Sequence, residues 1–191
     1  MNINKVSYKT VNFLFEAGTL RKLARSHRQR LLTDDLSDNI ASHSFRVSLI
    51  GYILANLERA DVSKVLLMCL FHDVPEARSN DLNWVHKKYV KVFENEIIND
   101  QLVGLPNCGE LKEVAKEFNI RTTKESRIAK DADNIDQVLL LKEYYWAGNR
   151  EAESWLKSRR QEKLLYTDSA KYLLKLIYKQ EPGAWTRKID R

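Results

Sequence analysis

Apolar side chains recur every three or four positions along most of this chain, which is the period of an amphipathic helix. The clearest example predicts a helix over about residues 41–58, with four apolar positions near one face: Phe45, Leu49, Ile53 and Leu57. The segment from Val65 to Phe71 is apolar at every position, and Asp61 or Ser63 can cap it. No alternation of period two and no hairpin turn flanks this segment, so we interpret it as a buried central helix.

Turn-forming and capping residues separate the predicted helices. Pro75 should end the central helix near Asp73, because a proline disfavours helix at the residue before it. Thr122 and Glu125 fit a capping box at the start of a helix that should continue to Gly148. The other predicted helices cover about residues 8–24, 84–103, 110–118, 150–161 and 167–180. Because no convincing strand remains, the predicted fold class is all-α.

The length and composition favour one globular domain over residues 1–191, because no repeat or low-complexity run offers a boundary. The longest apolar run, Val65 to Phe71, is far shorter than the roughly 20 residues that a membrane span needs. The first five residues also lack the pattern of a secretory signal. We therefore expect a cytoplasmic protein with no membrane partner.

The net charge of +6 suits an anionic partner, such as a nucleotide. Lys and Arg are scattered along every segment, and the densest cluster, residues 20–30, has no interleaved aromatic side chains for stacking on bases. A solvated helix face accounts for most of this charge. We therefore expect no specific nucleic-acid partner.

Side chains of metal-ligating type occur at predicted helix ends or on otherwise apolar faces: His43, His72, Asp73 and Asp133. His72 and Asp73 directly follow the apolar run, where a buried, unpaired Asp would be unfavourable. At the C-terminus of a helix, both side chains of such a pair can reach one ion beyond the end. Imidazole and carboxylate ligands suit a borderline or hard divalent cation: Mn, Fe, Co, Ni, Zn or Mg. Taken singly, His43 and Asp133 also fit surface or capping roles.

Three segments in a fixed order carry a resemblance to a known family: residues 39–47 around His43, residues 70–77 around His72 and Asp73, and residues 129–136 around Asp133. They are similar to the H…HD…D segments of HD-domain hydrolases, and in particular to the small bacterial and archaeal 5′-deoxynucleotidase branch. Glu76 and the sequence Asn80-Asp81-Leu82 make the ordered set more specific than His-Asp alone. The likeness covers about residues 10–150, and the helices of residues 150–180 should pack on that core.

The resemblance implies roles for six residues. The four metal-ligating side chains would hold one divalent ion, which activates a water and neutralises charge on a phosphoryl group. Glu76 would orient or deprotonate the attacking water, and Asp81 would lie near the leaving 5′ oxygen. A surface acid and a helix cap are the alternatives for these two residues. The resemblance also implies a homodimer.

Asp131 and Asp133 both occur in the third segment, and only one can be the ligand. The family pattern selects Asp133, which lies three residues before the acid Asp136 and ten before Glu143. On a helix, Asp133, Asp136 and Leu140 share a face, whereas Asp131 points about 200° away from Asp133. We therefore expect Asp133 to be the ligand and Asp136 to support the site.

Two arginines are candidates for contact with a phosphate. Arg28, fifteen residues before His43, resembles a family arginine that helps to bind the nucleotide phosphate. Arg46, three residues after His43, could also reach a phosphate, with a surface salt bridge as the alternative. Gln29 occupies the position at which the deoxynucleotidase branch has a tryptophan that helps to exclude ribose, so the sugar preference stays open.

The leading hypothesis is hydrolysis of a nucleoside 5′-monophosphate to nucleoside and phosphate. One alternative is a phosphohydrolase acting on another small phosphate ester or a nucleoside triphosphate, and another is a non-catalytic nucleotide-binding HD module. A binuclear site would need extra histidines between the His-Asp pair and the last Asp, and only His86 lies there. We therefore expect one metal ion per chain.

Overall fold

Helices form almost all of the regular structure in the computed structural model, which describes residues 7–189. Within this range there is no strand, and one isolated backbone pairing joins Ala24 and Asn39. The predicted all-α class is therefore confirmed. No described helix is long and apolar enough to cross a bilayer. The first five residues, on which the argument against a secretory signal was based, lie outside the described range.

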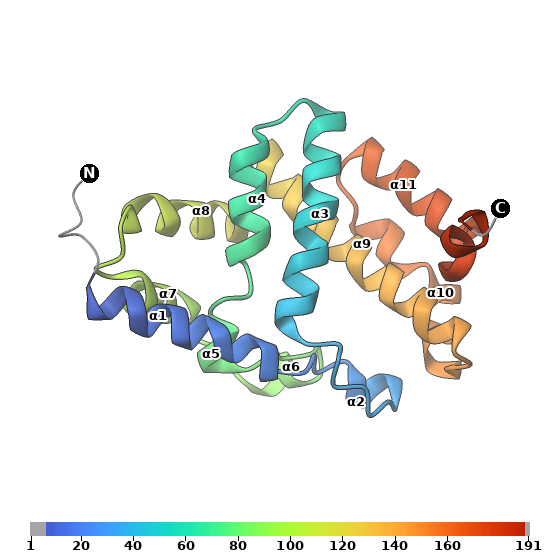
Figure 1. The fold of residues 1–191 in the computed structure, drawn as a ribbon, viewed down its shortest axis with the longest axis horizontal. Helices are drawn as coiled ribbons and strands as arrows, with labels where there is room; N and C mark the ends of the chain where they lie inside the picture. Colours follow the sequence, from blue (N-terminus) through green and yellow to red (C-terminus); the bar gives the residue numbers. More distant parts are fainter. Residues whose placement is uncertain (1–6, 190–191) are drawn as a thin grey trace.

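Three helices form the centre of the fold: α3 (Ile40–Glu58), α4 (Val62–Phe71) and α9 (Lys124–Trp146). α3 and α4 stand side by side, and α9 crosses behind both (Figure 1). α8 (Cys108–Ile120) packs on α4 and α9, while α10 (Arg150–Ser158) and α11 (Asp168–Lys179) pack on α9. The C-terminal helices thus lie against the central group. The extent of the domain stays a prediction.

Short elements surround one end of this central group. They are α1 (Tyr8–Gly18), the 3-10 helix η2 (Thr19–Lys22), α2 (Arg28–Leu31), α5 (Glu76–Ser79), α6 (His86–Tyr89) and α7 (Glu94–Leu102). They lie along the lower edge of the view in Figure 1. Two further 3-10 helices, η3 (Arg160–Leu164) and η4 (Pro182–Lys188), follow α10 and α11.

The predicted helix over residues 84–103 is wrong, because the structure breaks it into α6 and α7. Val90, directly after α6, has extended backbone angles, with φ −119° and ψ 130°. Three apolar side chains of this segment are exposed, so burial does not stabilise a continuous helix there: Tyr89, Val90 and Phe93. Asn83 instead caps one short turn, and its Oδ1 accepts hydrogen bonds from the backbone N–H groups of Val85 and His86.

Three predicted helix boundaries shift by a few residues. The first helix ends at Gly18, and extended backbone begins at Leu23. α4 ends at Phe71, so His72 caps it and Asp73 lies beyond its end. The N-cap of α9 is Thr123, whose side chain accepts a hydrogen bond from the N–H of Ser126, so the capping box at Thr122 is wrong.

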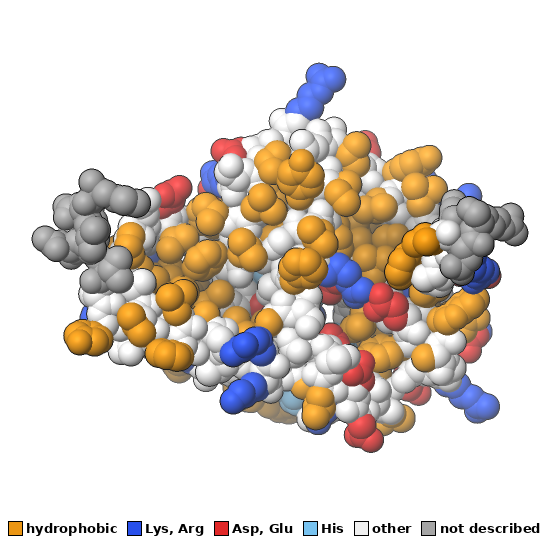
Figure 2. Space-filling model, viewed as in Figure 1, with side chains coloured by type: hydrophobic (Ala, Val, Ile, Leu, Met, Phe, Trp, Pro, Cys, Tyr) orange, Lys and Arg blue, Asp and Glu red, His pale blue; other side chains and the backbone are white. Residues whose placement is uncertain are grey.

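The apolar stripe predicted on α3 faces outward. Phe45, Leu49, Ile53 and Leu57 are 49–66% exposed. The core side of α3 carries Val47 and Leu54, both fully buried. Gly51 lies on this inner side, and a Cβ there would come within 2.6 Å of the Cys69 sulfur, so the glycine permits close packing of α3 on α4. Apolar side chains are accordingly spread over the surface seen in Figure 2.

Candidate metal centre

Three parts of the fold bring the predicted metal ligands together. His43 lies in the first turn of α3, which Asn39 caps by accepting a hydrogen bond from the N–H of Ser42. His72 and Asp73 directly follow the end of α4, and Asp133 lies on α9. Because these three helices pack against one another, side chains distant in sequence meet at one point.

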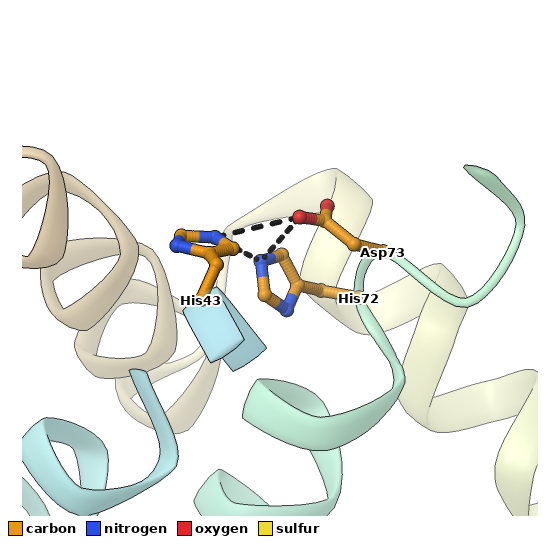
Figure 3. Close-up of side chains that lie close together, drawn as sticks. All are labelled: His43, His72 and Asp73. Atoms are coloured by element: carbon orange, nitrogen blue, oxygen red, sulfur yellow. Dashed lines mark hydrogen bonds and ion pairs between the residues drawn. The ribbon is translucent and has the colours of Figure 1, made fainter. Parts of the chain in front are cut away.

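The ligand atoms of His43, His72 and Asp73 face one another (Figure 3). The Nε2 atoms of His43 and His72 are 3.3 Å apart. Asp73 Oδ2 lies 3.4 Å from His43 Nε2 and 3.2 Å from His72 Nε2. The ligand atoms of these three residues all lie within 4.8 Å of one another, a spacing that could hold a metal ion. Asp133 Oδ1 joins them at 3.3 Å from His43 Nε2.

Hydrogen bonds hold both imidazoles with Nε2 toward the cluster. His72 Nδ1 lies 2.9 Å from the carbonyl oxygen of Cys69, which can only accept a hydrogen bond. His43 Nδ1 lies 2.6 Å from Asp136 Oδ2. Donation from each Nδ1 leaves an Nε2 lone pair for a metal, an arrangement typical of metal-ligating histidines. The donor set therefore fits a divalent cation.

The electrostatics of the cluster also favour a positive charge at its centre. Burial lowers the pKa of His43, as does Arg25, but Asp133, Asp136 and Asp73 outweigh both and raise it to about 10. Burial alone would raise the pKa of Asp133, but Lys130 and the histidines hold it well below the usual range. The carboxylates therefore stay ionised and stabilise a cation between them.

Arg46 supports the cluster from the side of α9. Its Nε donates to Asp136 Oδ1, and its Nη1 donates to Glu143 Oε1 at 2.6 Å. Asp136 in turn contacts His43, so Arg46 acts through Asp136. The guanidinium does not line the cleft described below. The structure thus shows the salt-bridge alternative for Arg46, and nothing in its placement supports contact with a phosphate.

A cleft of about 660 Å³ opens beside the candidate metal ligands, and His72, Asp73 and Asp133 line it. Glu76, on the first turn of α5, lines the same cleft. Its Oε2 is buried and has no hydrogen-bond partner among the described residues. Burial raises the pKa of Glu76 to about 9, with further contributions from Asp73 and Asp81. Glu76 therefore lies beside the candidate ligands, in surroundings that favour its protonated form.

Asp81 connects this cleft to the chain that precedes α2. Its Oδ2 accepts a hydrogen bond of 2.6 Å from the backbone N–H of Ser26. The same oxygen lies 3.6 Å from Arg25 Nε. Asp81 is therefore part of the cleft wall and positions Arg25, in addition to any contact with a ligand.

Arg25 lines the cleft, whereas the predicted Arg28 does not. The predicted helix over about residues 8–24 does not include Leu23 and Ala24 in the structure, and the backbone N–H of Arg25 donates to the carbonyl of Asp38 at 3.0 Å. This pairing places Arg25 beside the start of α3. Burial lowers the pKa of Arg25, but four nearby carboxylates raise it, Asp73 first among them. The basic cluster of residues 20–30 contains both arginines. The phosphate contact of Arg28, which the family resemblance implied, stays a prediction.

The two aspartates on α9 have different surroundings. Asp133 faces His43, whereas Asp131 is fully buried on another side of the helix. Asp131 accepts hydrogen bonds from the backbone N–H groups of Tyr166 and Thr167, both at 2.8 Å, and from the Thr167 hydroxyl at 2.7 Å. Asp131 thus holds the start of α11. Of these two aspartates, only Asp133 lies beside His43.

The chain matches the sequence profile of the HD domain over residues 17–171. Among curated proteins, no sequence matches this chain. Several solved structures share the fold. A conserved hypothetical protein from Pyrococcus furiosus has a TM-score of 0.74 and 23% identity, with 89% of this chain and 99% of that chain covered.

Two other similar structures have descriptive names. A predicted metal-dependent phosphohydrolase from Magnetospirillum magnetotacticum has a TM-score of 0.68 and 19% identity, and 90% of each chain is covered. The HD phosphohydrolase DatZ of cyanophage S-2L, bound to dA and one catalytic Zn²⁺ ion, has a TM-score of 0.55 and 19% identity. That likeness covers 87% of this chain and 96% of the cyanophage chain.

Proposed function

This chain belongs to the HD-domain family, and from that premise we propose that it is a metal-dependent phosphohydrolase acting on nucleoside 5′-monophosphates. The observation that carries the proposal is the meeting of His43, His72, Asp73 and Asp133 beside Glu76. The buried Oε2 atom of Glu76 has no hydrogen-bond partner among the described residues. The phosphohydrolases among the similar structures support the reaction class, and dA in the cyanophage protein supports a nucleotide ligand.

The four ligands would hold one divalent ion, drawn from Mn, Co, Mg, Fe, Ni and Zn. When bound, such an ion supplies Lewis acidity at a phosphoryl oxygen and acidifies water. Glu76 would orient the attacking water and take its proton. Burial favours the protonated form of this carboxyl, whereas a bound cation nearby would favour the ionised form that can accept the proton.

Arg25 would bind the phosphate in the role that the sequence assigned to Arg28. Its Nε is buried and has no hydrogen-bond partner within residues 7–189, so it can donate to a phosphoryl oxygen. Asp81, held by Ser26 N–H, would keep the guanidinium in place while standing near the leaving 5′ oxygen. Arg30 and Lys87 line the same cleft and add to its attraction for an anion.

The size of the cleft favours a nucleotide over a smaller phosphate ester. Its volume of about 660 Å³ lies within the range of roughly 300–1,000 Å³ that is typical of pockets for drug-sized ligands. A nucleoside triphosphate also fits this range. The choice of a monophosphate substrate is therefore a separate part of the proposal, which the volume does not support. A module that only binds nucleotides would not use the buried Oε2 atom of Glu76, which has no hydrogen-bond partner within residues 7–189. The predicted homodimer stays a prediction, and the outward apolar stripe of α3 is compatible with it.

A phosphate-release screen tests this proposal. The purified protein, loaded separately with each divalent metal, is assayed on nucleoside mono-, di- and triphosphates and on sugar phosphates. We expect release from nucleoside 5′-monophosphates, abolished by EDTA and by His43→Ala. Release from triphosphates alone would replace the monophosphate assignment, and no release from any ester with any metal would leave the binding-module alternative.

A further inference from the structure

The cleft continues beyond the metal centre into a space between α9, α10 and η3. Asn134 and Gln137 of α9 line this part, together with Trp155 of α10 and Gln161 of η3. We call these four residues the distal pocket. Asn134 directly follows the proposed ligand Asp133, so one turn of α9 contributes to both the metal centre and the distal pocket.

Two side-chain amides in the distal pocket each have one buried atom without a hydrogen-bond partner among the described residues. Asn134 and Gln161 are each 7% exposed. The Nδ2 atom of Asn134 and the Oε1 atom of Gln161 are buried, and neither has a hydrogen-bond partner within the described part of the chain. Because buried polar groups in folded proteins are nearly always hydrogen-bonded, these atoms indicate a ligand that completes them.

The turn that carries Gln161 is held in place by its own contacts. Arg159, between α10 and η3, has a positive φ of 48°, which reverses the chain direction. Its guanidinium lies over the Tyr178 ring at 4.4 Å, and Nη1 donates to Glu162 Oε1 at 2.6 Å. Gln161 is therefore presented to the cleft by a restrained turn.

The chemistry of the distal pocket fits an uncharged heterocycle. Asn and Gln amides pair a donor with an acceptor, which matches the donor and acceptor edges of nucleobases. Trp155 lines the same space, and aromatic side chains offer bases a stacking surface. Lys130, which also faces the cleft, is already paired with Asp133 at 2.5 Å. The outer phosphates of a triphosphate are the competing ligand, and the test below separates the two.

We propose that the distal pocket binds the nucleobase of the substrate through the amides of Asn134 and Gln161. This rests on the proposed function, which places the 5′-phosphate at the metal centre. The nucleotide then lies along α9 from Asp133 toward Gln137. Gln161 contributes to base selection, and hydrolysis is carried out at the other end of the cleft.

Gln161→Leu tests the proposal with two measurements. The first is calorimetric binding of the four common nucleosides, which carry no phosphate. The second is the ratio of kcat/KM for a nucleoside 5′-monophosphate to kcat/KM for ribose 5-phosphate, which carries no base. We expect about tenfold weaker binding of the preferred nucleoside and about a tenfold lower ratio, the size of effect typical of one lost hydrogen bond to a buried group. Gln180→Leu, at an exposed position after α11, is the matched control.

Thermal unfolding separates this role from a structural one. Because Gln161 Oε1 has no partner within residues 7–189, its replacement by Leu should leave the Tm unchanged or raise it. A lower Tm together with unchanged nucleoside binding would overturn the proposal in favour of a structural role. If Gln161→Leu does not fold, Gln161→Met, of similar length, takes its place in both measurements.

The outcomes distinguish this proposal from the proposed function. Phosphate release by the wild type, with equal nucleoside binding in wild type and Gln161→Leu, overturns the base site and leaves hydrolysis intact. Nucleoside binding that is weakened by Gln161→Leu, in a protein that hydrolyses no ester, supports the base site and removes the hydrolysis. A loss confined to triphosphate substrates, with nucleoside binding unchanged, assigns the pocket to outer phosphates and overturns the proposal.

Discussion

Asp136 holds the imidazole of His43 by a hydrogen bond of 2.6 Å between Oδ2 and Nδ1, and this contact joins residues 93 positions apart in the sequence. Arg46 holds the other oxygen of the same carboxylate. Asp136 therefore determines which nitrogen of His43 is free to bind a metal. The orientation of His43 therefore depends on a residue that is not itself one of the candidate ligands.

Replacing Asp136 with Asn should weaken metal binding without removing a ligand. An Asn can present an N–H instead of an acceptor to Nδ1, so the favoured tautomer of His43 is lost. Outer partners of this kind typically contribute about 10–100-fold to metal affinity. Titration of the metal-free Asp136→Asn variant with Co²⁺ or Zn²⁺ measures the change, and an affinity equal to that of the wild type would contradict the role of Asp136.

One divalent ion should bind per chain, because residues 7–189 contain one cluster of suitable ligands. Elemental analysis after metal exchange should give a stoichiometry near one. His43→Ala and Asp133→Ala should each reduce it. A reproducible value near two would exclude the mononuclear site.

Asp131→Ala is the matched control for Asp133→Ala, because the two residues lie on different sides of α9. It should keep the metal but lower the free energy of unfolding by on the order of 1–3 kcal/mol, since the N–H groups of Tyr166 and Thr167 lose their acceptor. Denaturant unfolding measures this loss. Loss of metal in Asp131→Ala with retention in Asp133→Ala would reverse the assignment.

Glu76→Ala should fold and keep the metal yet lose most of the hydrolysis. Removing a general base typically lowers the rate by about 10²–10⁴-fold. Glu113→Ala, an exposed change on α8, should have little effect. Steady-state kinetics and metal content on the same preparations decide the matter, and near-wild-type turnover by metal-loaded Glu76→Ala would refute the role.

Arg25→Ala should raise KM for the phosphate ester more than Arg28→Ala does. Hydrogen bonds to charged groups contribute about 1.5–3 kcal/mol, which corresponds to roughly a 10- to 150-fold change in KM. Arg28 has no place in the cleft, so its replacement should change KM little. The opposite order of effects would support the arginine that the sequence spacing selected.

Metal binding should release a proton at neutral pH. The metal-free cluster raises the pKa of His43 to about 10, so its imidazole is protonated below that pH and the proton competes with the metal. Affinity for the metal should therefore rise as the pH increases toward 10. Calorimetry in two buffers of different ionisation enthalpy counts the protons, and identical enthalpies in both would show that none is released.

Local sequence patterns were sufficient for the class of the fold, and the resemblance to a known family selected the residues that meet at the candidate metal centre. The spacing of apolar residues predicts helices because the number of residues per turn is a local property of the helix and does not depend on what the helix packs against. Helix geometry agreed with the choice of Asp133 over Asp131 that the family pattern made, since both residues lie on one continuous helix. The ordered His, His-Asp and Asp segments predicted the residues that the structure brings together.

Tertiary packing determined everything that depends on contacts between distant segments. Apolar residues recur every three to four positions on both the inner and the outer face of α3. Only the packing of α4 and α9 against the helix therefore shows that Phe45 faces outward. Arg25 reaches the cleft because Ala24 pairs with Asn39, and residue spacing through an irregular connection does not reveal such a pairing. Only the tertiary structure could show that Asn134 Nδ2 and Gln161 Oε1 have no hydrogen-bond partner among the described residues. Whether a buried polar atom is hydrogen-bonded depends on all its neighbours in space.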